Sequence, residues 1–187
     1  MDPIHNRVFV LCALMLLTIS LLAGCIGGGD DGDASFNGSL ASLLLTDNEL
    51  PEEFREDVER ESMTEDDIDD NDFGISEGEM LSAMYYDENF NFGVIYQMVV
   101  RVDADKREDA LNDFKDSEMV EYGDALQSVN FGKIGDKTVG FKLSEAGMDA
   151  YELAFIKKDI MVLFLVSVDE GGESLIKSLA QKVESKI

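Results

Sequence analysis

The densest group of side chains that could do chemistry is an acidic run at residues 65–72. Calcium is bound in proteins by about six to eight oxygen atoms, and a loop with this many carboxylates can supply several of them. No register fits an EF-hand, because a loop that starts at Asp67 places Asp72 where glycine is required. A solvated acidic loop is the simpler interpretation. The alternative is a calcium site formed by Asp66, Asp67, Asp69, Asp70 and Asp72.

Two further segments have the residue spacing of known catalytic or phosphate-binding motifs, but each lacks other residues that its motif requires. Ser174 and Lys177 have the Ser-x-x-Lys spacing of penicillin-recognising enzymes, whose other motifs are absent. We therefore predict that Ser174 caps the last helix. Residues 135–140 have the glycine spacing of a phosphate-binding loop, but Phe141 stands where the essential lysine belongs. This stretch is predicted to be a turn between strands.

Histidine and cysteine are almost absent from the chain. The histidine is His5, and the cysteines are Cys12 and Cys25. Loss of an amino-terminal segment would remove His5 and Cys12, which excludes Ser-His-Asp and Cys-His nucleophiles, Cys/His zinc sites and a disulfide within the domain. We therefore expect no enzyme activity and no cofactor, unless calcium binds. A carboxylate-dependent hydrolase, which needs only paired acids, is the least favoured alternative.

The amino terminus has the order of a secretory signal peptide. Arg7 precedes an apolar run at residues 8–22, and small residues follow it. The run is too short for a comfortable membrane span, which takes about 20 apolar residues. Leu22-Ala23-Gly24-Cys25 resembles the lipobox of bacterial and archaeal lipoproteins. This resemblance implies that Cys25 becomes the lipid-modified first residue of the mature chain; an uncleaved anchor is the alternative.

The predicted organisation has three parts. Residues 1–24 form the signal peptide, residues 25–38 a lipidated flexible tether rich in glycine and aspartate, and residues 39–187 a single domain. Asn37-Gly38-Ser39 has the form of an N-glycosylation acceptor. Without Asp2 and Arg7 the chain keeps 39 acidic and 14 basic residues, and its net charge stays at −25. Such a charge repels nucleic acid and anionic lipid headgroups and could attract a basic partner.

The elements that would position these residues belong to the α+β class. We expect a central, mainly antiparallel sheet of about five to six strands, with helices on both faces and a C-terminal helix. Residues 92–102 alternate between apolar and other side chains, as a half-buried strand does. Residues 160–168 are apolar on both faces, which predicts a central strand covered on both sides. Lys158-Asp159 predicts a hairpin turn before it.

The order of a hairpin, a helix, further strands and a final helix resembles the PsbP/Mog1-type sandwich. Leu50-Pro51 and Gly135-Asp136 stand at similar places in small envelope lipoproteins of that kind. The resemblance implies a binding or assembly module rather than an enzyme. We therefore expect an extracytoplasmic lipoprotein, held at the cell membrane by the lipid on Cys25, that binds an unidentified envelope protein and no nucleic acid. A lipoprotein that binds a cation or a solute through residues 65–72 is the alternative.

Overall fold

The structure is a computed structural model that describes residues 35–63, 75–86, 92–145 and 148–187. The predicted signal peptide, Cys25 and the acidic run at residues 65–72 lie outside these ranges.

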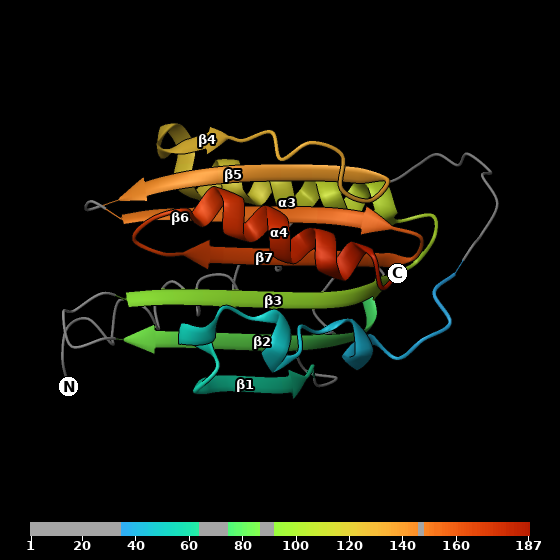
Figure 1. Ribbon diagram of the computed structural model, residues 1–187. Coiled ribbons are helices and arrows are strands. Elements are labelled where there is room, and N and C mark those ends of the chain that lie inside the picture. Colours follow the sequence, from blue (N-terminus) through green and yellow to red (C-terminus); the bar gives the residue numbers. More distant parts are fainter. Residues whose placement is uncertain (1–34, 64–74, 87–91, 146–147) are drawn as a thin grey trace.

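One antiparallel sheet of seven strands organises the domain (Figure 1). The strand order across the sheet is β1-β2-β3-β7-β6-β5-β4. The strands are β1 (Asp57–Ser62), β2 (Ile75–Tyr86), β3 (Phe92–Val102), β4 (Leu126–Ser128), β5 (Lys137–Glu145), β6 (Met148–Lys157) and β7 (Ile160–Ser167). The predicted α+β class and antiparallel sheet are confirmed.

The strand that the sequence did not predict is β1, at one edge of the sheet. Of its residues, only Val58 is partly buried, and the others are exposed. A strand that is exposed on both faces shows no alternation of apolar and polar residues, so its pattern cannot be told from a loop. The expected count of five to six strands is therefore lower than the observed seven, because β1 was missed.

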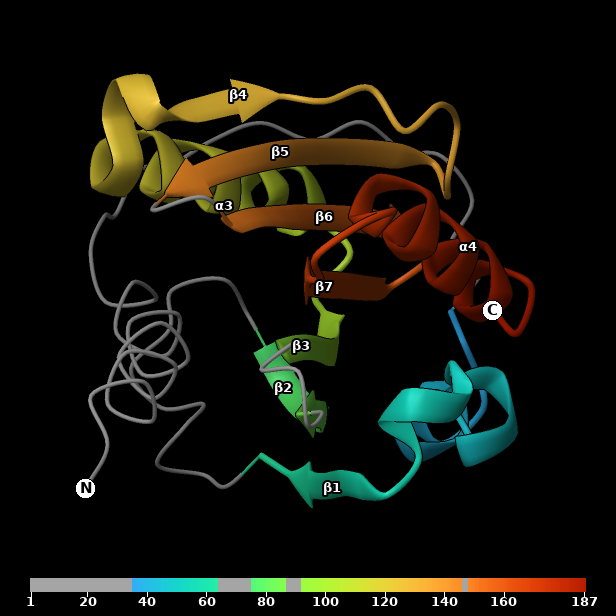
Figure 2. The same cartoon turned by 60° about the vertical axis from the view of Figure 1, so that its left-hand side comes forward.

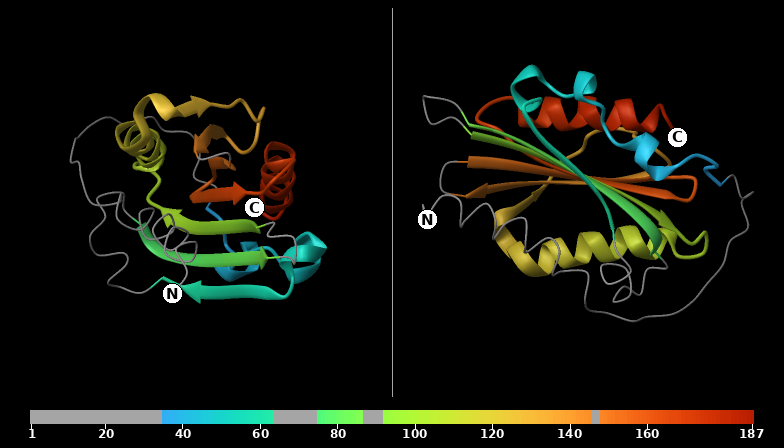
Figure 3. Two further views of the ribbon diagram at one scale, coloured as in Figure 1. Left: turned by 90° about the vertical axis from the view of Figure 1, so that its left-hand side faces the viewer. Right: turned by 90° about the horizontal axis from the view of Figure 1, so that it is seen from below.

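Two α-helices cover opposite faces of the sheet, as predicted (Figure 3, right). Helix α3 (Arg107–Tyr122) packs on β5 and β6, and helix α4 (Gly172–Glu184) packs on β6 and β7. The face under α4 is also covered by three short 3-10 helices, which lie on the same side in Figure 2. These are η2 (Leu40–Leu43), η3 (Asp47–Glu49) and η4 (Glu52–Phe54).

Strand β7 is central and buried on both faces, as its apolar pattern predicted. It lies between β3 and β6. Its alternate residues enter two different core clusters, with Phe164 under α4 and Met161 under α3. The predicted turn at Lys158 is also confirmed, with the residue in the left-handed region at φ 56°.

Helix α4 does not begin as predicted. Its N-cap is Gly171 in the left-handed conformation, at φ 76°, and Ser174 lies exposed inside the first turn without a capping bond. The prediction that Ser174 caps the helix is therefore wrong. The predicted apolar stripe of α4 is confirmed, since Ile176, Leu179 and Val183 are fully buried. Burial of each such side chain contributes about 1.5–3 kcal/mol.

A buried amide joins the first 3-10 helix to the sheet. Gln97 of β3 is 0 % exposed. Its Oε1 accepts a hydrogen bond from the N–H of Leu45 at 2.9 Å, and its Nε2 donates to the carbonyl of Leu43 at 3.1 Å. Both backbone groups would otherwise be buried without partners, so this one side chain fixes how residues 40–45 sit on the sheet.

Candidate functional site

The predicted site residues fall into two groups. Cys25, Asp66, Asp67, Asp69, Asp70 and Asp72 lie outside the described residues. Asn37 lies within them and is exposed, so its amide is accessible for modification. In residues 35–63, 75–86, 92–145 and 148–187, no group of three or more His, Cys, Asp or Glu could hold a metal ion. No helix in these ranges is long and apolar enough to cross a membrane.

The chain is fixed to the sheet at Phe36, inside the segment that we assigned to the tether. The N–H of Phe36 donates to Oδ1 of Asp159 at 2.6 Å, and its carbonyl accepts from Nη1 of Arg101 at 3.0 Å. Arg101 also forms ion pairs with Asp159 and with Glu77, the latter at 2.6 Å. Phe36 is therefore held beside the turn between β6 and β7.

The exposed large hydrophobic side chains of the described residues gather at the other end of the sheet. Val120 is 85 % exposed near the C-terminus of α3, and Met119 beside it is also exposed. Tyr86 ends β2, and Met148 begins β6. In Figure 1 β2 ends and β6 begins at the left-hand end of the sheet, whereas the turn between β6 and β7, to which Phe36 is bound, lies at the right-hand end.

Acidic residues occupy the same end as these hydrophobic side chains. Asp124 follows α3, and Asp169 and Glu170 lie between β7 and α4; all three are exposed. Single exposed hydrophobic residues are ordinary on a protein surface. Their concentration at one end, which also carries exposed carboxylates, distinguishes this surface. We call it the distal end; it comprises Tyr86, Met119, Val120, Asp124, Met148, Asp169 and Glu170.

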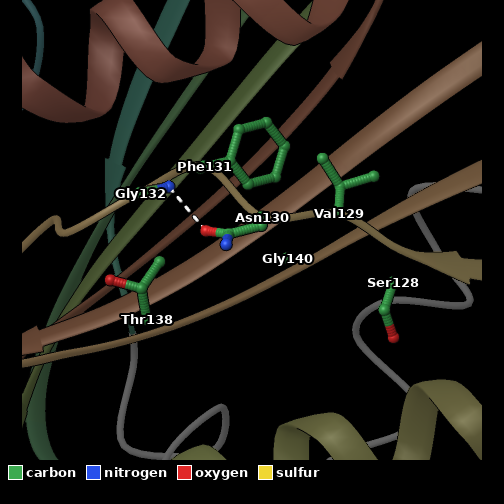
Figure 4. A pocket seen from close by; sticks show the side chains of 7 residues that line it. All are labelled: Ser128, Val129, Asn130, Phe131, Gly132, Thr138 and Gly140. Atoms are coloured by element: carbon green, nitrogen blue, oxygen red, sulfur yellow. Dashed lines mark hydrogen bonds between the residues drawn. The ribbon is translucent and has the colours of Figure 1, made fainter.

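A hollow of about 240 Å³ lies where the chain leaves β4 (Figure 4). The N–H of Val129 donates a hydrogen bond to the carbonyl of Gly140 at 2.8 Å. Beyond it, Oδ1 of Asn130 accepts from the N–H of Gly132 at 2.9 Å, and Gly132 has a positive φ of 81°. This turn bends the chain away from β5 and opens the space. The lining residues are Ser128, Val129, Asn130, Phe131, Gly132, Thr138 and Gly140.

The ring of Phe131 forms the apolar wall of the hollow and requires glycine at position 140. A β-carbon on Gly140 would lie 2.3 Å from Cδ2 of Phe131. The ring therefore occupies the space that any larger residue at position 140 would fill. Phe131 is 2 % exposed, so the hollow rests directly on the core beneath α4.

A pair of carboxyl groups lies buried beneath α3. Glu118 of α3 and Glu152 of β6 are each 3 % exposed, and their side chains hydrogen-bond to each other. The Oε2 atoms of both residues have no hydrogen-bond partner. Two carboxylates cannot hydrogen-bond without a proton between them, so the contact requires one of the two groups to be protonated.

Burial sets the protonation of this pair. Burial, with the charge of Glu118 and the hydrogen bond to it, raises the pKa of Glu152 to about 9. Burial also raises the pKa of Glu118, while the bond that Glu152 donates works in the opposite direction. Tyr122, on the next turn of α3, has a raised pKa because of burial and the charge of Glu121. Glu152 is therefore the neutral donor of the pair at pH 7.

The pair does not resemble the accessible carboxylates that a hydrolase needs. Neither Glu118 nor Glu152 lines the hollow, and both are shielded from solvent. The geometry therefore lends no support to the carboxylate-dependent hydrolase. The sequence contained a signal for the pair that we did not use: Leu111, Phe114 and Glu118 follow helical spacing, which places Glu118 on the buried stripe.

No protein-family model matches the sequence, and no curated protein matches it. The fold is similar to that of the extracellular domain of PknH from Mycobacterium tuberculosis, with a TM-score of 0.53 and 14 % sequence identity. The similarity covers 79 % of this chain and 95 % of that domain. At this identity it shows the fold alone, an α+β sandwich. The resemblance to the PsbP/Mog1 type remains a prediction.

Proposed function

We propose that the protein is an exported lipoprotein and that its domain is a non-catalytic binding or assembly module. Lipid on Cys25 would hold it at the extracytoplasmic face of the cell membrane, with the glycine- and aspartate-rich residues that follow as a tether. Three observations support the proposal: the order of the amino-terminal segment, the lack of imidazole and thiol groups after Cys25, and a fold similar to that of an extracellular domain.

The observation that carries the proposal is the distribution of exposed hydrophobic side chains. Because Phe36 is held at one end of the sheet, the tether leaves the domain at that end. The distal end is then the part of the domain farthest from the attachment of the tether, and it carries Val120, Met148 and their apolar neighbours. Exposed apolar groups favour contact with another protein.

The charge of the distal end indicates the chemistry of the partner. Asp124, Asp169 and Glu170 are exposed at the same end of the sheet as the apolar side chains. A partner that buries these side chains must bring basic groups to the carboxylates, because like charges across an interface are strongly unfavourable. We infer an envelope protein that presents apolar residues bordered by lysine or arginine.

Site-specific photo-crosslinking in intact membranes tests this function. A photoreactive residue at Val120 of the full-length chain should capture one partner, and one at Gln181, exposed on α4, should not. Capture from a probe at Asp124 should disappear in the double variant Val120→Glu and Met148→Glu. Both side chains are exposed, so we expect the free energy of unfolding to change by less than about 0.5 kcal/mol per substitution. Equal capture from Gln181, or capture unchanged by the double variant, would contradict the proposal.

The membrane attachment needs a test of its own. Mass spectrometry of the purified protein should find a lipid on Cys25 of the wild-type chain, whereas the variant Cys25→Ser should carry none and should keep its signal peptide. A lipid that persists in this variant would lie on another residue and overturn the lipobox interpretation.

A further inference from the structure

Almost every basic residue of the domain has a partner. Nine donate to backbone carbonyls or carboxylates, and Lys106 and Arg107 also make polar interactions. The three that have no hydrogen bond or ion pair within the described part of the chain are Lys115, Lys133 and Lys177. All three are exposed, so their ammonium groups remain available to another molecule.

Two of these three lysines are beside the hollow at the end of β4. Nζ of Lys177, on α4, lies 3.7 Å from the position that a β-carbon would take at Gly132. Lys133 follows Gly132 in the chain and is exposed. Lys115 is exposed on α3, which covers the opposite face of the sheet (Figure 3). The hollow therefore has one unpaired ammonium group beside its lining, that of Lys177, and a second unpaired lysine next to Gly132 in the chain.

The lining of the hollow is rich in hydrogen-bond donors. Oδ1 of Asn130 already accepts from Gly132, so the amide NH₂ group remains to donate to another molecule (Figure 4). Ser128 contributes an exposed hydroxyl group. None of the seven lining residues is acidic, although acids outnumber bases by 40 to 15 in the chain. A surface of this kind complements a ligand rich in acceptor oxygens.

We propose that this hollow binds a small organic anion. Lys133 and Lys177 would neutralise its carboxylate or phosphate group, and Asn130 and Ser128 would donate to its other oxygens. Phe131 provides an apolar wall for the carbon skeleton. The negative potential of the whole protein opposes such binding, so the site depends on these two ammonium groups. The inference goes beyond the proposed function, because the hollow is lined by other residues than those of the distal end.

Titration of the full-length lipidated chain in detergent micelles tests the proposal. The probes are glucuronate, glycerol 3-phosphate and uncharged glucose at constant ionic strength, and the readout is the NMR shift of the Gly132 and Asn130 amides. At least one anion should produce a saturable shift, and glucose should produce none at the same concentration. A response to glucuronate alone identifies a carboxylate ligand, and a response to glycerol 3-phosphate alone identifies a phosphate.

Variants of the lysines provide the decisive comparison. The double variant Lys133→Gln and Lys177→Gln should bind the anion at least tenfold more weakly, while Lys115→Gln, which removes an equally unpaired charge, should bind as the wild type does. Gly140→Ala should also weaken binding, because it displaces the ring of Phe131; its thermal melting is measured in parallel. No saturable shift with either anion, an equal response to glucose, or an equal loss in Lys115→Gln would overturn the proposal. Crosslinking at Val120 is a separate readout, so either idea can fail without the other.

Discussion

Glu118 of α3 and Glu152 of β6 hydrogen-bond to each other within the core, although both are acids and each is 3 % exposed. The bond exists because one of the two carboxyl groups keeps its proton. Helix α3 is thus joined to the sheet by a contact whose strength depends on pH.

The first prediction concerns the pH dependence of stability. In the unfolded chain Glu152 loses its proton near its ordinary pKa of 4.5, whereas in the folded protein it does so near 9. Between these values the folded state holds more protons, so this group makes the free energy of unfolding fall as pH rises, by up to about 1.4 kcal/mol per pH unit. The stabilisation is complete below pH 4.5 and is lost as pH approaches 9.

The variant Glu152→Gln isolates this effect, because the amide is neutral at every pH and still donates to Glu118. Urea denaturation between pH 6 and 8.5 should give a flatter profile than the wild type, with the variant more stable at pH 8. Asp116→Asn, which removes an exposed charge from the same helix, should leave the slope unchanged. Parallel profiles for Glu152→Gln and the wild type would contradict the shared proton.

The second prediction concerns Arg101, which holds Phe36 to the sheet. Its side chain is 23 % exposed and pairs with Asp159, whose side chain is 12 % exposed. Arg101→Gln should lower the free energy of unfolding by about 1–3 kcal/mol. It should also speed hydrogen exchange at the Phe36 amide, which donates to Asp159. Lys137→Gln breaks an ion pair between exposed side chains, so a smaller loss is expected there.

The third prediction concerns Gln97. Gln97→Leu leaves the N–H of Leu45 and the carbonyl of Leu43 buried without partners, which should cost about 2–4 kcal/mol. Gln127→Leu, at an exposed position of β4, should change stability by less than about 0.5 kcal/mol. Urea denaturation of both variants gives the comparison. Equal stability of the two would mean that Gln97 does not fix residues 40–45.

The fourth prediction concerns the acidic run at residues 65–72. A calcium site there predicts that calcium, at a hundredfold excess over its dissociation constant and constant ionic strength, stabilises the domain by about 2.7 kcal/mol. The melting temperature would rise by roughly 5–10 °C. Replacing Asp66, Asp67, Asp69, Asp70 and Asp72 by asparagine would abolish the rise. If calcium does not raise the melting temperature of the wild type, residues 65–72 are better interpreted as a solvated loop or as a segment that docks a partner.

Strands with a clear face could be predicted from the sequence, and an edge strand could not. The two apolar faces of β7 report directly that both of its sides are buried. The alternation in β3 was misleading, because Ile95, Gln97 and Val99, on the face expected to be exposed, are fully buried as well. Strand β1 carries no such pattern, because only Val58 is partly buried in it. Its pairing with β2 depends on backbone hydrogen bonds, which any sequence can form.

The hollow and its lysines could not be found from the sequence. Lys133 and Lys177 are distant in the chain, and no spacing rule brings them to the same place. Gly140 is required because Phe131 lies over it, a relationship between two segments that meet only after β4 and β5 have paired. The sequence-based candidates at residues 65–72 came instead from local density of one residue type.

The sequence by itself determined the α+β class, the helix on each face, the central place of β7 and the absence of imidazole and thiol groups after Cys25. These properties follow from composition and from the period of the apolar pattern, which are local quantities. Tertiary structure alone decided that Glu118 meets Glu152, that Arg101 holds Phe36, and that the ammonium group of Lys177 lies beside Gly132. Each of these contacts joins residues from separate elements, so it depends on strand order and helix placement, which a local pattern does not encode.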